Sequence, residues 1–231
     1  MITPELTALI ITAASIGFVH TLLGPDHYLP FVAMAKARGW SSLKTSIITI
    51  LCGLGHVLSS VVLGLVGVAF GVAVTKLRTV ESVRGNLAAW ALIAFGLVYF
   101  VWGLRRAMRK VAHTHLTGSH AHLHDSSGHH HADSLPEKAN ITPWVLFTVF
   151  VLGPCEPLIP ILMYPAAQRS TSGMILVTIV FGVVTISTMV GLVALLNRGI
   201  QLVPLHRLER FSHALAGFVI LLCGVTIQFG L

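Results

Sequence analysis

Six side chains in apolar surroundings have the types and spacing of metal ligands. Five stand close to glycine-proline pairs and one lies in another apolar stretch: His20, Asp26, His27, His56, Cys155 and Glu156. Imidazole nitrogen, carboxylate oxygen and thiolate sulfur form a donor set of intermediate softness, which suits Ni²⁺, Co²⁺ or Zn²⁺ better than Mg²⁺ or Ca²⁺. A carboxylate inside a bilayer costs on the order of 3 kcal/mol, and a bound cation would offset its charge. These residues predict a divalent transition-metal site.

Plainer interpretations of the same residues stay open. Asp26 and Glu156 are also suited to capping the amino ends of helices that begin after the prolines. A single histidine or cysteine in a membrane helix, such as His56 or Cys155, is more often a packing residue than a ligand. We expect no lysine or arginine in the central part of any apolar segment, so no basic side chain is expected to balance the two carboxylates.

Two halves of the sequence are related by an offset of 129 residues. The stretch 23–29 reads LGPDHYL, the stretch 152–158 reads LGPCEPL, and the same offset pairs Gly53 with Gly182. If each half holds three membrane spans, the second half enters the membrane from the opposite face. The sequence therefore predicts an inverted repeat, a pattern found in many transporters.

Each half should interrupt a helix at its glycine-proline pair. Proline removes a backbone donor and clashes with the preceding turn, and glycine allows the change of direction. The expected helix breaks are at Gly24, Pro25, Gly153 and Pro154. A straight helix would hold His20 about 10 Å from His27 along its axis. A fold-back at the first break would instead bring His20 towards Asp26 and His27.

Composition places the chain in a membrane. Hydrophobic residues make up 55% of it and charged residues only 10%, whereas a soluble domain carries about a quarter charged residues. Stretches long enough to span a bilayer lie near 6–24, 45–74, 87–104, 142–165, 173–196 and 211–230. We therefore predict an all-α polytopic membrane protein with six transmembrane helices in a 3+3 inverted repeat, the first and fourth helices being broken.

A histidine-rich segment joins the two repeats. We expect a first three-helix repeat at 1–106, a loop at 107–140 and a second three-helix repeat at 141–231. A dense set of imidazoles binds metal through changing ligand sets, although a polar spacer would have a similar composition. The residues expected to capture metal in this loop are His113, His115, His120, His122, His124, His129, His130 and His131.

The lysines and arginines that give the formal charge of +7 are distributed unevenly among the connections between the expected spans. Eleven of the 15 lysines and arginines fall in the first, third and fifth connections between the expected spans. By the positive-inside rule these connections are cytoplasmic, so both termini lie outside. We therefore expect a multi-pass protein of the inner (plasma) membrane, with a cytoplasmic histidine-rich loop and no nucleic-acid partner. The three cysteines show no paired spacing, so no disulfide framework is expected.

The run from His20 to His27 (HTLLGPDH) resembles the H-x4-D-H signature of the nickel/cobalt transporters, which include the NicO and UreH-like membrane proteins; here five residues separate His20 from Asp26. The Gly55-His56 pair is similar to the second-span histidine of that family. The Gly-Pro-Cys155 motif resembles the wider superfamily of TauE/SafE-type exporters and cytochrome c biogenesis membrane proteins. The resemblance implies a transporter and not an enzyme, with nickel or cobalt as cargo and no permanently bound cofactor.

Our prediction from the sequence is a membrane transporter of a divalent transition-metal cation. Its expected partners are the metal ion, the lipid bilayer, and a metal-delivery protein or a second copy of the chain. A sulfite or organic-anion exporter is an alternative, but two carboxylates at the site would repel an anion. An electron carrier of the cytochrome c biogenesis type would need a cysteine in each half, and Asp26 stands where the first would be. A metal sensor that does not transport is the remaining alternative.

Overall fold

The computed structural model describes residues 4–109, 142–153, 155, 157–168, 170–202 and 209–229. The eight loop histidines, Pro154 and Glu156 lie outside the described residues. Within the described ranges every regular element is a helix, as predicted: α1 (Pro4–Leu23), η1 (Pro25–His27), α2 (Leu29–Arg38), α3 (Ser42–Ala69), α4 (Val74–Arg109), α5 (Thr142–Leu152), α6 (Leu158–Ala167), α7 (Thr171–Leu202), η2 (Glu209–Phe211) and α8 (Ser212–Gln228).

Five helical segments in the described ranges are long and apolar enough to cross a membrane: α1, α3, α4, α7, and η2 together with α8. The helices α5 and α6 have 11 and 10 residues, and each is too short to span a bilayer alone. The fourth expected span, 142–165, is therefore divided between two short helices. The count of six spans and their 3+3 inverted repeat stay predictions.

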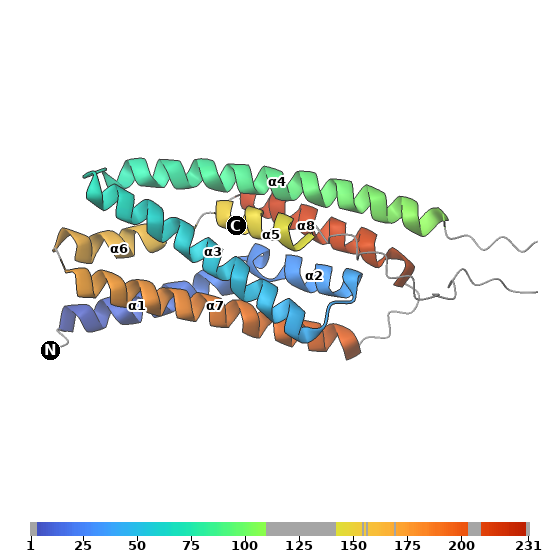
Figure 1. The fold of residues 1–231 in the computed structure, drawn as a ribbon, viewed down its shortest axis with the longest axis horizontal. Helices are drawn as coiled ribbons and strands as arrows, with labels where there is room; N and C mark the ends of the chain where they lie inside the picture. The colour runs from blue at the N-terminus through green and yellow to red at the C-terminus, as the bar shows by residue number, and fades with distance from the viewer. Residues whose placement is uncertain are drawn as a thin grey trace, which may run out of the picture.

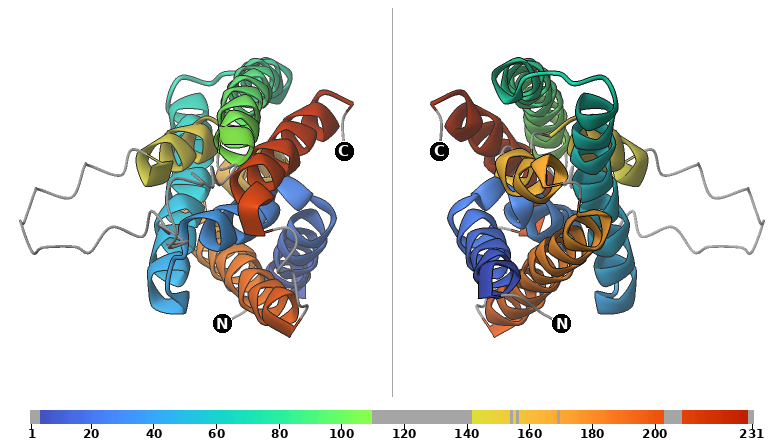
Figure 2. Two further views of the ribbon diagram at one scale, coloured as in Figure 1. Left: turned by 90° about the vertical axis from the view of Figure 1, so that its right-hand side faces the viewer. Right: turned by 90° about the vertical axis from the view of Figure 1, so that its left-hand side faces the viewer.

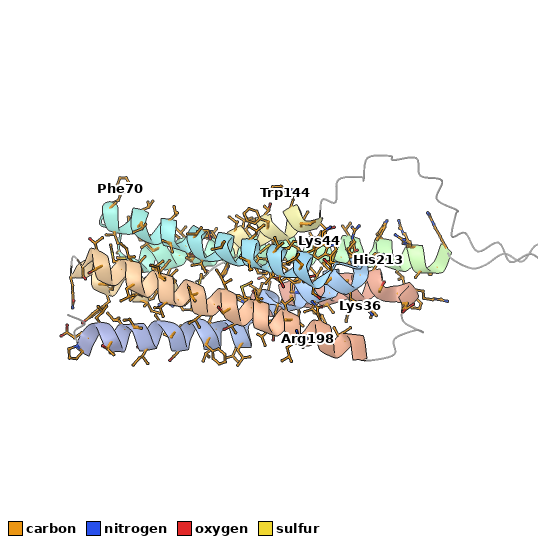
Figure 3. All side chains as sticks on the ribbon, turned by 60° about the horizontal axis from the view of Figure 1, so that its bottom comes forward. Lys36, Lys44, Phe70, Trp144, Arg198 and His213 are labelled. Carbon is orange, nitrogen blue, oxygen red and sulfur yellow. The ribbon has the colours of Figure 1, made fainter. Side chains whose placement is uncertain are left out.

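The helices form an elongated bundle (Figures 1 and 2). Along its long axis, α1 and α2 follow one another, and so do α6 and α5 (Figure 1). The most extensive packing joins α4 to α8 and α1 to α7, while α3 contacts both α5 and α7. Many large apolar side chains face outward, among them Phe70 and Trp144 at 79% and 71% exposure (Figure 3). Such a surface is suited to contact with lipid tails.

Local sequence signals set several helix ends. The Ser41 hydroxyl accepts a hydrogen bond from the Lys44 backbone N–H at 3.2 Å and so caps the start of α3. Gly39 ends α2 and Gly71 follows α3, each with a left-handed φ, of 62° and 61°, which glycine adopts without steric penalty. Both ends of α6 lie 129 residues after the corresponding ends of α2, and α7 begins 129 residues after α3. The helix boundaries thus follow the offset that relates the two halves of the sequence.

Helices α4 and α8 approach so closely that their backbones touch. A Cβ atom added at Gly96 or Gly103 of α4 would meet backbone atoms of α8, and one added at Gly217 of α8 would meet the backbone of α4. Small residues permit such contacts between membrane helices, where dispersion forces replace the hydrophobic effect as the source of attraction.

Helix α4 begins earlier than the sequence indicates. The apolar pattern predicts a connection between residues 74 and 87, but the helix starts at Val74 and takes in the charged residues Lys76, Arg78, Glu81 and Arg84. The fully buried Glu81 pairs with the partly buried Arg84 at 2.8 Å, which neutralises the charge that Glu81 brings into the bundle. Lys36, Lys44 and Arg198 lie in the half of the bundle away from Phe70 (Figure 3), so basic residues of the first and fifth connections share one half of the bundle.

Candidate metal centre

Three imidazoles from separate elements converge inside the bundle. His20 lies in the last turn of α1, His27 in η1 and His56 in the middle of α3, and their ligand nitrogens all lie within 4.8 Å of one another. The ring centroids of His20 and His27 are 4.7 Å apart, and those of His27 and His56 are 5.1 Å apart. Two nitrogens that bind one ion at about 2.1 Å each lie no more than about 4.2 Å apart. Small side-chain rotations would therefore bring the three nitrogens close enough to bind one metal ion.

The interruption after α1 brings His27 back towards His20. The Gly24 N–H completes the helix by donating to the His20 carbonyl at 3.0 Å, but Pro25 has no N–H with which to continue the ladder. The His27 N–H instead donates to the Gly24 carbonyl at 3.1 Å and closes the turn of η1. The two rings therefore lie in contact, whereas a straight helix would separate the residues by about 10 Å.

The hydrogen bonds at Nδ1 leave the Nε2 atoms available. His27 Nδ1 lies 3.2 Å from both the Gly24 carbonyl and Asp26 Oδ1, and His56 Nδ1 lies 3.3 Å from the Phe150 carbonyl. A carbonyl oxygen only accepts, so Nδ1 carries the proton in both rings and Nε2 presents a lone pair. A partner of this kind at the other ring nitrogen is the usual arrangement of metal-binding histidines.

All three Nε2 atoms are buried without a hydrogen-bond partner among the described residues. They belong to His20, His27 and His56, of which the last two are each only 3% exposed. Leaving a buried polar atom unsatisfied is unfavourable by roughly 1–3 kcal/mol, and such atoms commonly mark a functional site or a ligand position. Three such rings, each with a ligand nitrogen within 4.8 Å of the other two, form a donor set that could hold a metal ion.

Asp26 contacts His27 at the ring nitrogen Nδ1. Its carboxylate pairs with the Nδ1 side of His27, away from Nε2, and its side chain is 23% exposed. The carboxylate also lines a cavity of about 20 Å³ together with His27, His56 and Gly153. This volume suffices for one water molecule or a small ion. The structure thus makes Asp26 an orienting partner of His27 that also places a negative charge beside the three rings.

The structure does not bring Cys155 into the three-histidine group. Its side chain is fully buried and packs in an apolar cluster with Val57, Leu158 and Phe181. Of the expected helix breaks, Gly24 lies between α1 and η1, Pro25 is the first residue of η1, and Gly153 follows α5. The residues Pro154 and Glu156 and the loop histidines lie outside the described ranges, so their proposed roles stay predictions.

Sequence reasoning missed a charged network beside the centre. Arg84 donates to Glu81 Oε1 at 2.8 Å, and to Ser59 Oγ and the Val151 carbonyl at 2.7 Å each. Arg84 lies outside the span expected at 87–104, so the sequence places it in a connection and does not predict these contacts. A signal was present: Leu77, Glu81, Arg84 and Ala88 recur at helical spacing, and the two apolar members are buried.

Comparison with known proteins gives one match. The chain matches the family described as "Cytochrome C biogenesis protein transmembrane region" over residues 29–226. No curated protein and no solved structure matches it. The matched range runs from the first residue of α2 into α8, so it includes His56 but not His20 or His27.

Proposed function

The chain belongs to the cytochrome C biogenesis transmembrane-region family of membrane proteins, and on that premise we propose that it transports a divalent transition-metal cation. The observation that supports this most directly is the three-histidine group. His20, His27 and His56 each offer a ligand nitrogen within 4.8 Å of the other two, and each has a buried Nε2 without a hydrogen-bond partner among the described residues. Imidazole donors suit Zn²⁺, Cu²⁺, Ni²⁺ and related ions rather than Mg²⁺ or Ca²⁺. The resemblance to nickel/cobalt transporters makes Ni²⁺ and Co²⁺ the first candidates.

In this proposal each residue has a separate task. The three Nε2 atoms hold the cation, while Asp26 orients the ring of His27 and supplies negative charge that offsets part of the ion's charge. The Phe150 carbonyl orients the ring of His56. Because protons compete with metal for imidazole nitrogen, affinity falls as the pH falls, and proton entry would help to release the ion. The loop histidines would collect metal at the cytoplasmic face of the inner membrane.

Electron transfer is the second candidate, because the family description names cytochrome c biogenesis. A carrier of reducing equivalents needs two cysteines close enough to form a disulfide, with Cα atoms about 4.4–6.8 Å apart. All three cysteines of the chain are free. Cys52 and Cys155 pack in different apolar clusters, and Cys223 Sγ faces the Pro25 carbonyl at 3.9 Å. The separate packing of the cysteines argues against a redox pair, so metal transport through the three-histidine group is the better-supported function.

Transport in sealed vesicles tests the proposal. The purified full chain should move Ni²⁺ or Co²⁺ down an imposed gradient, with Zn²⁺ and Mn²⁺ as competing cargo, and His56→Ala should abolish this movement. Sulfite flux and thiol oxidation, measured on the same vesicles, cover the two alternatives. Metal flux that His56→Ala leaves unchanged, or thiol exchange without metal flux, would contradict metal transport through this centre.

A further inference from the structure

The carboxyl end of α5 has an unusual set of hydrogen-bond partners. Helix ends leave their last carbonyls without intrahelical donors, and in a membrane these groups need partners from the protein. The Gly153 N–H donates to the carbonyls of Val149 and Phe150, at 2.8 and 3.1 Å. Proline at position 154 brings no N–H, and His56 Nδ1 donates to the Phe150 carbonyl at 3.3 Å. Arg84 donates to the next carbonyl, that of Val151, at 2.7 Å.

Arg84 therefore caps α5 from a different helix. A positive charge at a helix carboxyl end is favourable, because it faces the negative end of the helix dipole. Glu81 fixes the guanidinium from one turn earlier on α4, and its side chain is fully buried. A guanidinium presents several donors in a rigid plane, so one arginine can satisfy partners on several elements at once.

A second chain of hydrogen bonds leads from Arg84 to the backbone of the same histidine. Arg84 donates to Ser59 Oγ at 2.7 Å, and the Ser59 hydroxyl donates in turn to the His56 carbonyl at 2.8 Å. Arg84 thus supports both the backbone of His56, through Ser59, and the end of α5 whose Phe150 carbonyl fixes the His56 ring. It makes these contacts without belonging to the group of three imidazoles.

We propose that Arg84, held by Glu81, is a positioning residue that orients His56 for metal binding. This inference rests on the proposed function, because it assigns Arg84 a task at the same centre. Loss of Arg84 would remove the donor to the Val151 carbonyl and to Ser59 Oγ, so that the His56 ring would no longer be held with its ligand nitrogen close to those of His20 and His27. Partners of this kind typically affect metal affinity by about 10- to 100-fold.

Co²⁺ titration of the detergent-solubilised full chain tests the inference. The eight loop histidines are replaced by glutamine in every sample, so that ligand-field absorption reports the core centre, and His56→Ala provides the spectrum of a centre lacking that ligand. Arg84→Met should lower Co²⁺ affinity about 10-fold and shift the absorption towards that of His56→Ala. Arg84→Lys should recover part of the affinity, since lysine keeps the charge but not the planar donor set.

Two further variants separate positioning from folding. Arg78→Met removes an exposed arginine of the same helix and should match the parent. Glu81→Gln combined with Arg84→Met leaves no unpaired buried charge, so it should fold and still bind Co²⁺ weakly. A role in stability alone would lower the unfolding temperature and leave the absorption spectrum unchanged, which would overturn the inference.

The outcomes distinguish the inference from the proposed function. A parent protein with no Co²⁺ absorption that depends on His56 would overturn metal binding at this centre, and the role of Arg84 with it. A parent that binds Co²⁺ through His56, with the same affinity and spectrum after Arg84→Met or the double substitution, would overturn the role of Arg84 alone.

Discussion

The two helix interruptions follow the same Leu-Gly-Pro sequence, at residues 23–25 and 152–154, but their carbonyls have different partners. At the first, two side chains of the interruption itself contribute: His27 Nδ1 faces the Gly24 carbonyl at 3.2 Å, and the Tyr28 hydroxyl donates to the Leu22 carbonyl at 3.4 Å. Cys223 of α8 adds a weak contact to the Pro25 carbonyl at 3.9 Å. At the second, the partners come from other helices, namely His56 of α3 and Arg84 of α4. The strongest side-chain partners are therefore local at the first interruption and come from other helices at the second.

The two interruptions therefore have different tasks at the three-histidine group. The first interruption supplies two of the three imidazoles, because the turn that satisfies its own backbone also returns His27 to His20. The second supplies no imidazole, and the Phe150 carbonyl just before it instead orients the third ring, that of His56. Substitutions at the first interruption should therefore affect metal binding directly, and those at the second should affect it through His56.

The largest expected effect is that of His27→Ala. This change removes one ligand and leaves Asp26 without its partner, so Ni²⁺ or Co²⁺ flux into vesicles should fall to background. His213→Ala is the matched control, because that histidine bonds the Tyr99 hydroxyl at 2.8 Å and lies outside the three-histidine group. Substantial flux through His27→Ala would show that the first interruption does not supply the ligands.

Paired glycine substitutions compare the two interruptions directly. A Cβ atom at Gly24 would lie 2.5 Å from His27 Nδ1, whereas one at Gly153 would lie 3.3 Å from His56 Nδ1. Gly24→Ala should therefore displace a ligand and lower metal affinity by about 10- to 100-fold, and Gly153→Ala should lower it by only a few-fold. Isothermal titration measures both, with Gly191→Ala as a control in open space. The reverse order would contradict the division of tasks.

Asp26→Asn should have an intermediate effect. The amide oxygen can still accept a hydrogen bond from His27 Nδ1, so the ring keeps its orientation while the negative charge beside the centre is lost. We expect about a 10-fold loss of metal affinity, measured by the same titration, with flux still detectable. Asp26→Ala removes the acceptor as well and should be more damaging. Equal effects of the two substitutions would show that charge alone matters.

Cys155→Ser should have the smallest effect on metal flux. The thiol is buried in an apolar cluster apart from the three imidazoles, so flux should change by less than about 2-fold, whereas a buried hydroxyl should lower stability by roughly 1 kcal/mol. Vesicle flux and thermal unfolding measure the two quantities. An electron carrier predicts the opposite result, with thiol exchange abolished by this substitution and unaffected by His27→Ala.

Much of the fold class follows from local sequence patterns. Apolar stretches and glycine-proline pairs are recognisable within a few turns of chain, so the amino-acid sequence alone predicts the all-helical class and points to the histidines at positions 20, 27 and 56. The start of α4 is harder to predict, because its charged residues resemble a loop until Glu81 is seen to pair with Arg84. The partner of His56 is a backbone carbonyl 94 residues away. Backbone acceptors carry no residue-type signal, so only the folded chain reveals such contacts.

The backbone contact between α4 and α8 restricts which helices can move to expose the three histidines. Glycines interlock the two helices at Gly96, Gly103 and Gly217, so neither helix can slide along the other without first separating from it. Packed interfaces of this kind have discrete arrangements and resist continuous deformation. If the chain transports metal as proposed, these two helices should move as one unit, and the change in access to the histidines should come from the interrupted helices that pack around them.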